Sequence, residues 1–156
     1  MELLKLTQFL LDCNEAGYAR GDSKQWHKET DCSTTIPFTQ GKWSAHDNFF
    51  GGEPYGGRLV VAYQKKPVWI MVYYGWVAEG VKVDPIYVVL REALSQMPAE
   101  APFRGPAKLT VGEFEYQNDW QGSVEQFAGE ESISLQGLLQ YQANYRGGLV
   151  DVRAGG

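Results

Sequence analysis

The sequence predicts a single α+β domain in which two related helix-plus-antiparallel-strands units form a curved sheet packed on two helices. Three observations lead to this prediction. The motif Trp-x6-Phe-x-Gly-Glu occurs twice, at residues 43–53 and 120–130. An amphipathic helix pattern precedes each copy, and paired strand-like runs around a tight turn follow it. Because a shared order of elements is typical of duplication, we expect repeat units at about residues 1–80 and 81–150.

Length and composition indicate the class of protein. A chain of 156 residues has the size of one domain, so residues 1–156 are expected to form a single core. Hydrophobic residues make up 44% and charged residues 21%, which is ordinary for a soluble globular protein. The formal net charge of -5 disfavours direct binding to nucleic acid or to an anionic membrane, since both need a basic face.

The compartment is predicted from apolar runs and cysteines. No apolar run approaches the ~20 residues that a membrane span requires. The first residues have the spacing of a helix face and lack the apolar stretch of a secretory signal. Cys13 and Cys32 are therefore expected to be reduced structural residues, and the protein is expected to be cytoplasmic.

Two helices are predicted. The first covers about residues 2–15, and Gly17 is placed to end it in the left-handed conformation. Its apolar stripe consists of Leu3, Leu6, Phe9, Leu10, Cys13 and Ala16. The second begins with Asp84 as N-cap and Pro85 at the first helical position, and it ends before Pro98. Its apolar residues are Ile86, Val89, Leu90, Ala93, Leu94 and Met97.

Strands of the first unit are predicted from alternating and β-branched residues. They are expected at residues 29–38, 42–50, 58–64 and 67–77, with hairpin turns at Gln40-Gly41 and Lys65-Lys66. Residues 51–57 contain four glycines and are expected to form a loop. The strand at residues 67–77 is apolar on both faces, which is typical of a strand that is covered on both faces. One face can hold the helices, and the other needs a ligand, a subunit partner or closure of the sheet.

Strands of the second unit are expected after an extended, proline-containing connector at residues 99–106. They are predicted at residues 108–117, 120–127, 132–135 and 138–145, with a hairpin turn at Gln136-Gly137. In the last strand, the inward residues are expected to be Leu139, Tyr141, Ala143 and Tyr145. The alternate residues of that strand are polar, so this unit is expected to have one solvated face.

Six segments together carry a resemblance to a known family. They are Phe-Phe-Gly-Gly-Glu-Pro-Tyr-Gly-Gly-Arg at 49–58, Lys-Pro-Val-Trp at 66–69, Tyr-Tyr-Gly at 73–75, Pro-Phe-Arg-Gly-Pro at 102–106, Phe-Ala-Gly-Glu-Glu at 127–131 and Tyr-Arg-Gly-Gly at 145–148. The chain resembles bacterial domain-of-unknown-function family 5680. Members of that family occur alone or behind an XRE-type helix-turn-helix domain, so the resemblance implies a bacterial protein with a sensory role. It implies no activity and no catalytic residues, and direct DNA binding by this chain is not expected.

Aromatic side chains on the strand at residues 67–77 predict a site for a small molecule. Trp69, Tyr73 and Trp76 are expected to line a cleft for a flat or cationic ligand, with Glu53 and Glu130 as polar anchors. Each feature also has a structural interpretation, which is the commoner one. Aromatic stripes on strands usually form core, and a glutamate at a glycine-rich bend usually braces the turn.

Two other functions remain open at the level of sequence. The chain could be a structural or protein-interaction module that forms a homodimer through the apolar strand at residues 67–77. It could also be an enzyme that uses Glu53, His46 or Asp47, because paired carboxylates can act as acid and base. Its catalytic residues would then be unknown, and we do not expect an enzyme. The histidines and cysteines have no metal-ligand spacing, so no metal and no cofactor are expected.

Overall fold

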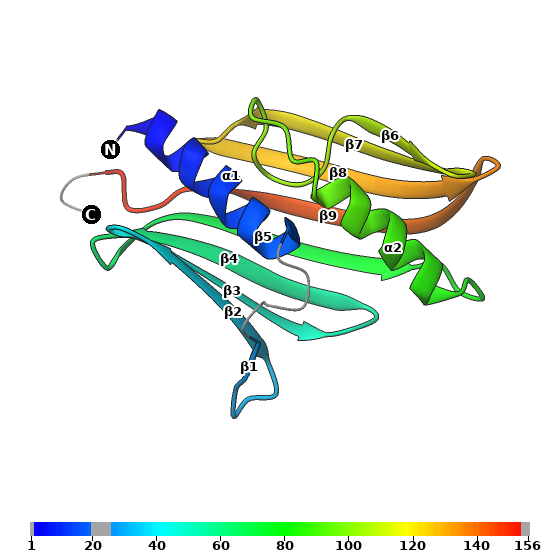
Figure 1. The fold of residues 1–156 in the computed structure, drawn as a ribbon, viewed down its shortest axis with the longest axis horizontal. Coiled ribbons are helices and arrows are strands. Elements are labelled where there is room, and N and C mark those ends of the chain that lie inside the picture. The colour runs from blue at the N-terminus through cyan, green and yellow to red at the C-terminus, as the bar shows by residue number, and fades with distance from the viewer. Residues whose placement is uncertain (1, 20–25, 154–156) are drawn as a thin grey trace.

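The computed structural model describes residues 2–19 and 26–153, which form two helices and one antiparallel sheet of nine strands (Figure 1). The helices are α1 (Leu3–Ala19) and α2 (Val83–Leu94). The strands are β1 (His27–Lys28), β2 (Thr34–Gln40), β3 (Trp43–Gly51), β4 (Tyr55–Tyr63), β5 (Lys66–Val77), β6 (Lys108–Val111), β7 (Phe114–Ser123), β8 (Gln126–Leu135) and β9 (Leu138–Leu149). Their order in the sheet is β1-β2-β3-β4-β5-β9-β8-β7-β6.

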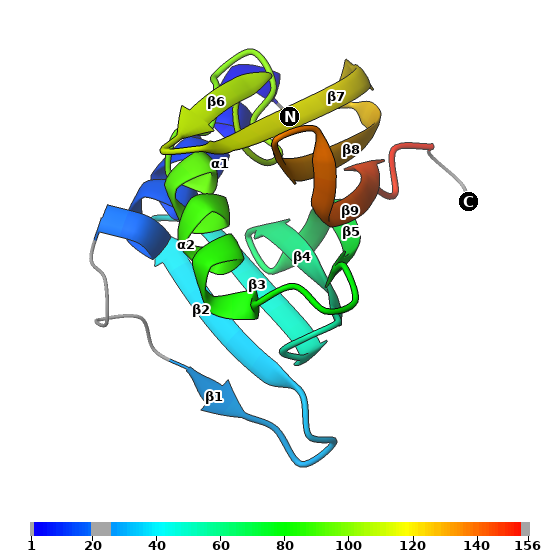
Figure 2. The ribbon, with the colours of Figure 1, turned by 90° about the vertical axis from the view of Figure 1, so that its right-hand side faces the viewer.

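The sheet curves around the two helices, which lie on one of its faces (Figure 2). We call this the concave face and the opposite one the outer face. On α1, residues Leu6, Phe9 and Leu10 are buried against the sheet. On α2, a second cluster packs against β7, β8 and β9. The predicted α+β class and the curved sheet on two helices are confirmed.

Glycines within the strands make room for aromatic rings on the concave face. The Tyr145 ring lies over Gly129, where a Cβ atom would overlap it. Gly57 lies beside Phe49, whose Cβ would be only 2.6 Å from an added Cβ. Residues 55–57, which the sequence predicted as loop, therefore belong to β4. Their glycines allow close packing across the strand pair and do not interrupt it.

Both helix boundaries differ from the prediction. The α1 helix continues past Gly17 to Ala19, because residues 16–18 still face the space between helix and sheet. The α2 helix begins at Val83, with Lys82 in the extended N-cap conformation. Asp84 therefore lies in the first helical turn, where its charge suits the helix dipole, and the N-cap prediction was wrong.

Strand boundaries also differ, most clearly in the second half of the chain. The predicted strand at residues 120–127 contains the turn between β7 and β8, and the one at residues 108–117 contains the turn at Gly112. One consequence concerns the sequence motif. Trp43 and Phe50 lie on the same strand, whereas Trp120 and Phe127 lie on neighbouring strands. The two motif copies therefore do not occupy equivalent positions.

Three smaller differences concern the first half of the chain. The predicted strand at residues 29–38 begins only at Thr34. The turn before it contains Cys32, whose φ of 71° lies outside the strand conformation. Gly41-Lys42 forms the β2–β3 turn and Gln64-Lys65 the β4–β5 turn, each one residue from the predicted pair.

The two faces of β5 have different environments in the single chain. Trp69 and Met71 are buried under the helices, whereas Val72 is 46% and Tyr74 52% exposed on the outer face. In β9, Tyr141, Ala143 and Tyr145 face the core as predicted, but Leu139 is 49% exposed near the hairpin end. Neither helix in the described part of the chain has the length and apolar character to span a membrane.

Candidate ligand-binding site

A cavity of about 660 Å³ lies on the concave face, between the two helices, strands β2 to β5 and the connector after α2. Its wall is largely apolar and aromatic, with residues such as Leu10, Ile36, Phe38, Phe49, Leu59 and Met71. Its polar side chains include Tyr18, Asp47, Tyr55, Tyr73, Tyr87 and Arg104. Size and lining are typical of pockets that hold small molecules.

Asp47 and Tyr73 form one polar pair in this wall. They come from β3 and β5, on either side of β4, and both face the helices. The Tyr73 hydroxyl donates a hydrogen bond of 2.5 Å to Asp47 Oδ1. Burial and the Asp47 charge both raise the pKa of Tyr73 well above its usual value. At neutral pH, Tyr73 is therefore a fixed hydrogen-bond donor to the carboxylate.

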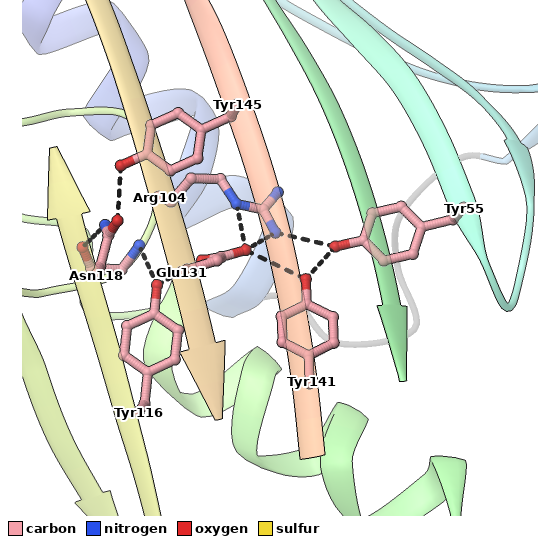
Figure 3. A network of polar contacts seen from close by, with 8 residues as sticks. Tyr55, Arg104, Tyr116, Asn118, Glu131, Tyr141 and Tyr145 are labelled. Atoms are coloured by element: carbon pink, nitrogen blue, oxygen red, sulfur yellow. Dashed lines mark hydrogen bonds and ion pairs between the residues drawn. The ribbon is translucent and has the colours of Figure 1, made fainter. Parts of the chain in front are cut away.

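Arg104 is placed at the cavity by the connector between α2 and β6. It is only 8% exposed, and its partner Glu131 on β8 is fully buried. Arg104 Nε donates to Glu131 Oε1 over 2.9 Å, and Nη2 donates to the same oxygen and to the Tyr55 hydroxyl (Figure 3). The guanidinium carbon also lies 5.6 Å from the centre of the Tyr73 ring.

Further tyrosines complete the coordination of the Glu131 carboxylate. Tyr116 donates to Oε2 over 2.5 Å, and Tyr141 donates to Oε1 over 3.2 Å (Figure 3). Burial lowers the pKa of Arg104, but the charge and hydrogen bond of Glu131 together with Tyr55 and Tyr141 outweigh this effect and leave the pKa well above its usual value. The pair is therefore charged and braced, and it joins the connector to the sheet.

Alkaline titration should reveal this environment, because burial raises the pKa of six of the nine tyrosines. The pKa of Tyr18, for example, is raised to about 12. The folded protein keeps these phenols protonated where the unfolded chain loses their protons, near pH 10. The resulting stability is complete below about pH 10 and falls as the pH rises further. We expect these six tyrosines to ionise in one cooperative step with unfolding, and their gradual ionisation in the folded state would contradict this.

Glu53 lies in the turn between β3 and β4 and braces it. Its Oε1 accepts a hydrogen bond of 2.6 Å from the Val77 backbone N–H, and its Oε2 accepts one from the Tyr87 hydroxyl. Tyr87 also donates to the Gly52 carbonyl over 2.8 Å. The turn is thus tied to the end of β5 and to α2. This is the structural role that the sequence favoured for a glutamate at a glycine-rich bend.

Replacing Glu53 with Ala should lower the free energy of unfolding by about 1 kcal/mol, because two hydrogen bonds at the turn are lost. Urea unfolding measures this change, and the exposed Glu79→Ala is the matched control. A functional role would give a different result, in which stability is unchanged and ligand binding is lost.

The other predicted site residues are distributed over different regions of the protein. Trp69 is fully buried in the core, where its Nε1 donates to the Val124 carbonyl over 2.9 Å. Trp76 lies on the outer face beside Tyr74. Glu130 is also exposed there and accepts a hydrogen bond from Gln142. Tyr73 is therefore the one of the five candidates that lines the concave cavity.

The residues of the enzyme hypothesis are not brought together either. His46 and Asp47 are neighbours on β3, so their side chains point to opposite faces of the sheet. Among residues 2–19 and 26–153, no group of three or more His, Cys, Asp or Glu side chains could hold a metal ion. A second hollow, of about 850 Å³, lies on the outer face near Tyr74 and Arg146. It is the more open of the two, so a ligand there would keep more of its surface in water.

Arg104 and Glu131 were not among the predicted site residues, although the sequence contained a signal for Glu131. Phe127, Glu131 and Ile133 alternate along one strand, which places the carboxylate on the same face as two apolar residues. Arg104 lies between a phenylalanine and a glycine in a connector that was predicted to be merely extended. No spacing rule links two residues that are 27 positions apart.

Family membership follows from a comparison of sequences. The family model described as domain of unknown function (DUF5680) matches residues 47–150. The chain belongs to this family. The part of the DUF5680 protein that matches includes Asp47, Tyr73, Arg104 and Glu131, whereas α1 precedes it. No curated protein and no solved structure matches the chain significantly.

Proposed function

We propose that this DUF5680 protein is a small-molecule-binding or sensing module and that its ligand binds in the concave cavity. The observation that carries the proposal is the combination of a cavity of about 660 Å³, an apolar and aromatic wall, and a few polar groups that converge on it. Pockets of this size and composition commonly enclose most of the surface of a small ligand.

Binding is favoured over catalysis by the protonation states at the cavity. Tyr73 and Tyr87 there have pKa values raised far from neutrality, and Arg104 is held in its charged form by Glu131. Efficient proton transfer needs a group whose pKa lies near the working pH. These side chains are therefore suited to holding a ligand in place.

A sensing role fits the setting that the family resemblance implied. In that setting the chain is a bacterial protein, cytoplasmic as its sequence predicts, whose relatives can be joined to an XRE-type DNA-binding domain. A ligand in the cavity would contact α1, α2 and the sheet together, because all three contribute to its wall. Binding could then alter how a neighbouring domain is held.

We also propose that residues 1–80 and 81–150 are related units. The order of elements supports this idea, because α1 precedes β2 to β5 and α2 precedes β6 to β9. In the sheet, β5 lies against β9, and the other strands follow in mirrored order on either side. The cavity would then lie between the two halves, since α1 and β2 to β5 come from the first and α2 with the connector after it from the second.

Native mass spectrometry of the purified protein tests the proposed function. We expect an added mass that is lost on denaturation, from a ligand that remains bound during purification. Ala16 lines the cavity and Glu15, its neighbour on α1, is exposed. Ala16→Phe should fill the space and abolish the adduct, whereas Glu15→Phe should leave it in place. An adduct that survives Ala16→Phe would place the ligand elsewhere.

A homodimer is the second candidate, and the exposed apolar residues Val72 and Tyr74 on the outer face favour it. Sedimentation over a range of concentrations tests this candidate directly. A dimer that Tyr74→Lys converts to a monomer would support an interface along β5. A protein that is monomeric at every concentration would contradict it.

A further inference from the structure

We infer that the ligand of the concave cavity is an uncharged, flat aromatic molecule that is held by apolar and ring contacts. This inference rests on the proposed function, since it names the class of ligand for the same cavity. Its basis is the state of the wall. The buried charged and polar groups there are engaged within the protein, and the surface that remains for a ligand is apolar and aromatic.

The described wall offers an anionic ligand no buried, unpaired cation. Its charged side chains are Asp47, Arg91 and Arg104. Arg104 is buried and is neutralised by the buried Glu131. Arg91 is exposed to water, where an ion pair contributes only about 0–1 kcal/mol. Removing a carboxylate from water costs several kcal/mol, so neither arginine compensates for an enclosed anion.

Two contacts disfavour a cationic ligand. Aromatic rings attract cations to their faces, but the guanidinium carbon of Arg104 already lies 5.6 Å from the centre of the Tyr73 ring. This ring is therefore already used by a cation of the protein. The carboxylate of Asp47 accepts the Tyr73 hydroxyl and is engaged in a further interaction in the protein. It is therefore not a free counter-charge for an ammonium group.

The tyrosine hydroxyls at the cavity are also used within the protein. The Tyr55 hydroxyl accepts a hydrogen bond of 3.1 Å from Arg104. The hydroxyls of Tyr73 and Tyr87 donate to acceptors on β3 and in the turn after it. Among the described residues, no buried side-chain nitrogen or oxygen lacks a hydrogen-bond partner. None of these groups therefore needs a polar ligand to complete its hydrogen bonds.

The rings of these tyrosines remain available to a ligand. The centres of the Tyr55 and Tyr73 rings are 6.0 Å apart, and those of Tyr55 and Tyr87 are 6.3 Å apart. The rings of Trp26 and Phe49 meet edge-on at 5.8 Å, and all five residues line the cavity. An aromatic ligand gains about 0.5–1.5 kcal/mol for each ring pair beyond the area that it buries. A saturated molecule of the same size lacks this gain.

Methionine side chains complement the aromatic surface. Met71 of β5 and Met97, which follows α2, also line the cavity. Thioether sulfur makes favourable contacts with aromatic rings, worth about 0.3–1.5 kcal/mol, and the flexible side chain adapts to the shape of its neighbour. The volume of about 660 Å³ leaves room for a fused ring system. Of the two ligand types that the sequence suggested, flat or cationic, the wall thus favours the flat one.

Four probes of similar size test the inference: 2-naphthalenemethanol, 2-naphthoate, 2-naphthylmethylammonium and the saturated decahydronaphthalene-2-methanol. We would measure their affinities for the intact protein by protein-observed NMR titration at neutral pH. The neutral aromatic alcohol should bind about tenfold or more tightly than either charged probe, because the wall compensates neither charge. It should also bind several-fold more tightly than its saturated analogue, which lacks the ring contacts.

Variants locate the probe and test the role of the rings. Ala16→Phe should abolish binding of 2-naphthalenemethanol, whereas Glu15→Phe, at an exposed position, should leave it unchanged. Tyr87→Leu should reduce the preference for the aromatic alcohol over the saturated one, since one ring of the wall is lost. A purely structural role of Tyr87 would lower both affinities and leave their ratio unchanged, which would contradict the inference.

The outcomes separate the inference from the proposed function. Equal or tighter binding of a charged or saturated probe would overturn the inference and leave the cavity as a binding site. Failure of all four to bind, with an adduct that Ala16→Phe abolishes, would show that the uncharged aromatic class is wrong. Failure of all four with no adduct in native mass spectrometry would overturn both.

Discussion

Glu131→Gln should lower the free energy of unfolding by about 3–5 kcal/mol, because it leaves the Arg104 guanidinium buried without its partner charge. The substitution keeps the shape of the side chain, so the loss does not come from a cavity. It also replaces the strong charged acceptor for Tyr116 and Tyr141 with a neutral amide. Urea unfolding followed by tryptophan fluorescence measures the change.

Glu130→Gln is the matched control for this experiment. Glu130 is the preceding residue on β8 but is exposed on the outer face, so the change in stability should stay within about 0.5 kcal/mol. Adding Arg104→Met to Glu131→Gln should restore part of the lost stability, because the uncompensated charge is removed. A loss below about 1 kcal/mol for Glu131→Gln would contradict the view that this ion pair braces the connector.

Gly147→Ala should lower the free energy of unfolding by about 3 kcal/mol, since the added methyl group has no room between β5 and β9. Its Cβ would overlap the Ile70 carbonyl oxygen and lie 2.8 Å from the Phe127 ring. Backbone atoms form part of the obstacle, so a change of side-chain rotamer cannot relieve the overlap. The strands themselves must move apart, and thermal or urea unfolding measures the cost.

Gly52→Ala is the control for the glycine substitution. Nothing lies within 4 Å of a Cβ at Gly52, and its φ is not positive. Stability should therefore stay the same or rise slightly, because alanine restricts the unfolded chain. Equal effects at the two positions would show that strand packing at Gly147 tolerates a side chain and would contradict the prediction.

Local patterns predicted the elements that depend on local physics. The apolar stripe of α1 and the alternation in β9 lead directly to Leu6 and Tyr141 as core residues, and both are fully buried. The boundaries that were wrong depend on distant packing. Gly17 does not end α1, which still packs on the sheet, and Gly57 does not interrupt β4, where it lies against Asn48 and Phe49 of the neighbouring strand.

The candidate site was less predictable than the fold. Sequence reasoning identified Tyr73 as a pocket residue, but it also grouped Trp69 and Trp76 with it. Their position on opposite faces of β5 follows from strand alternation, which separates odd from even residues. Arg104 could not be assigned from the sequence, because the connector is brought to the cavity by the fold of the whole chain.

The order of the strands has a consequence for the path by which this chain folds. Within the described sheet, every pair of neighbours except β5 with β9 joins strands that are consecutive in sequence. Such hairpins close short loops, and a short loop costs little conformational entropy. The β5–β9 pairing instead brings together Val77 and Tyr141, across one helix and three strands. The entropic cost of assembling the sheet is therefore concentrated in one late contact, and the low contact order elsewhere favours rapid formation of each half.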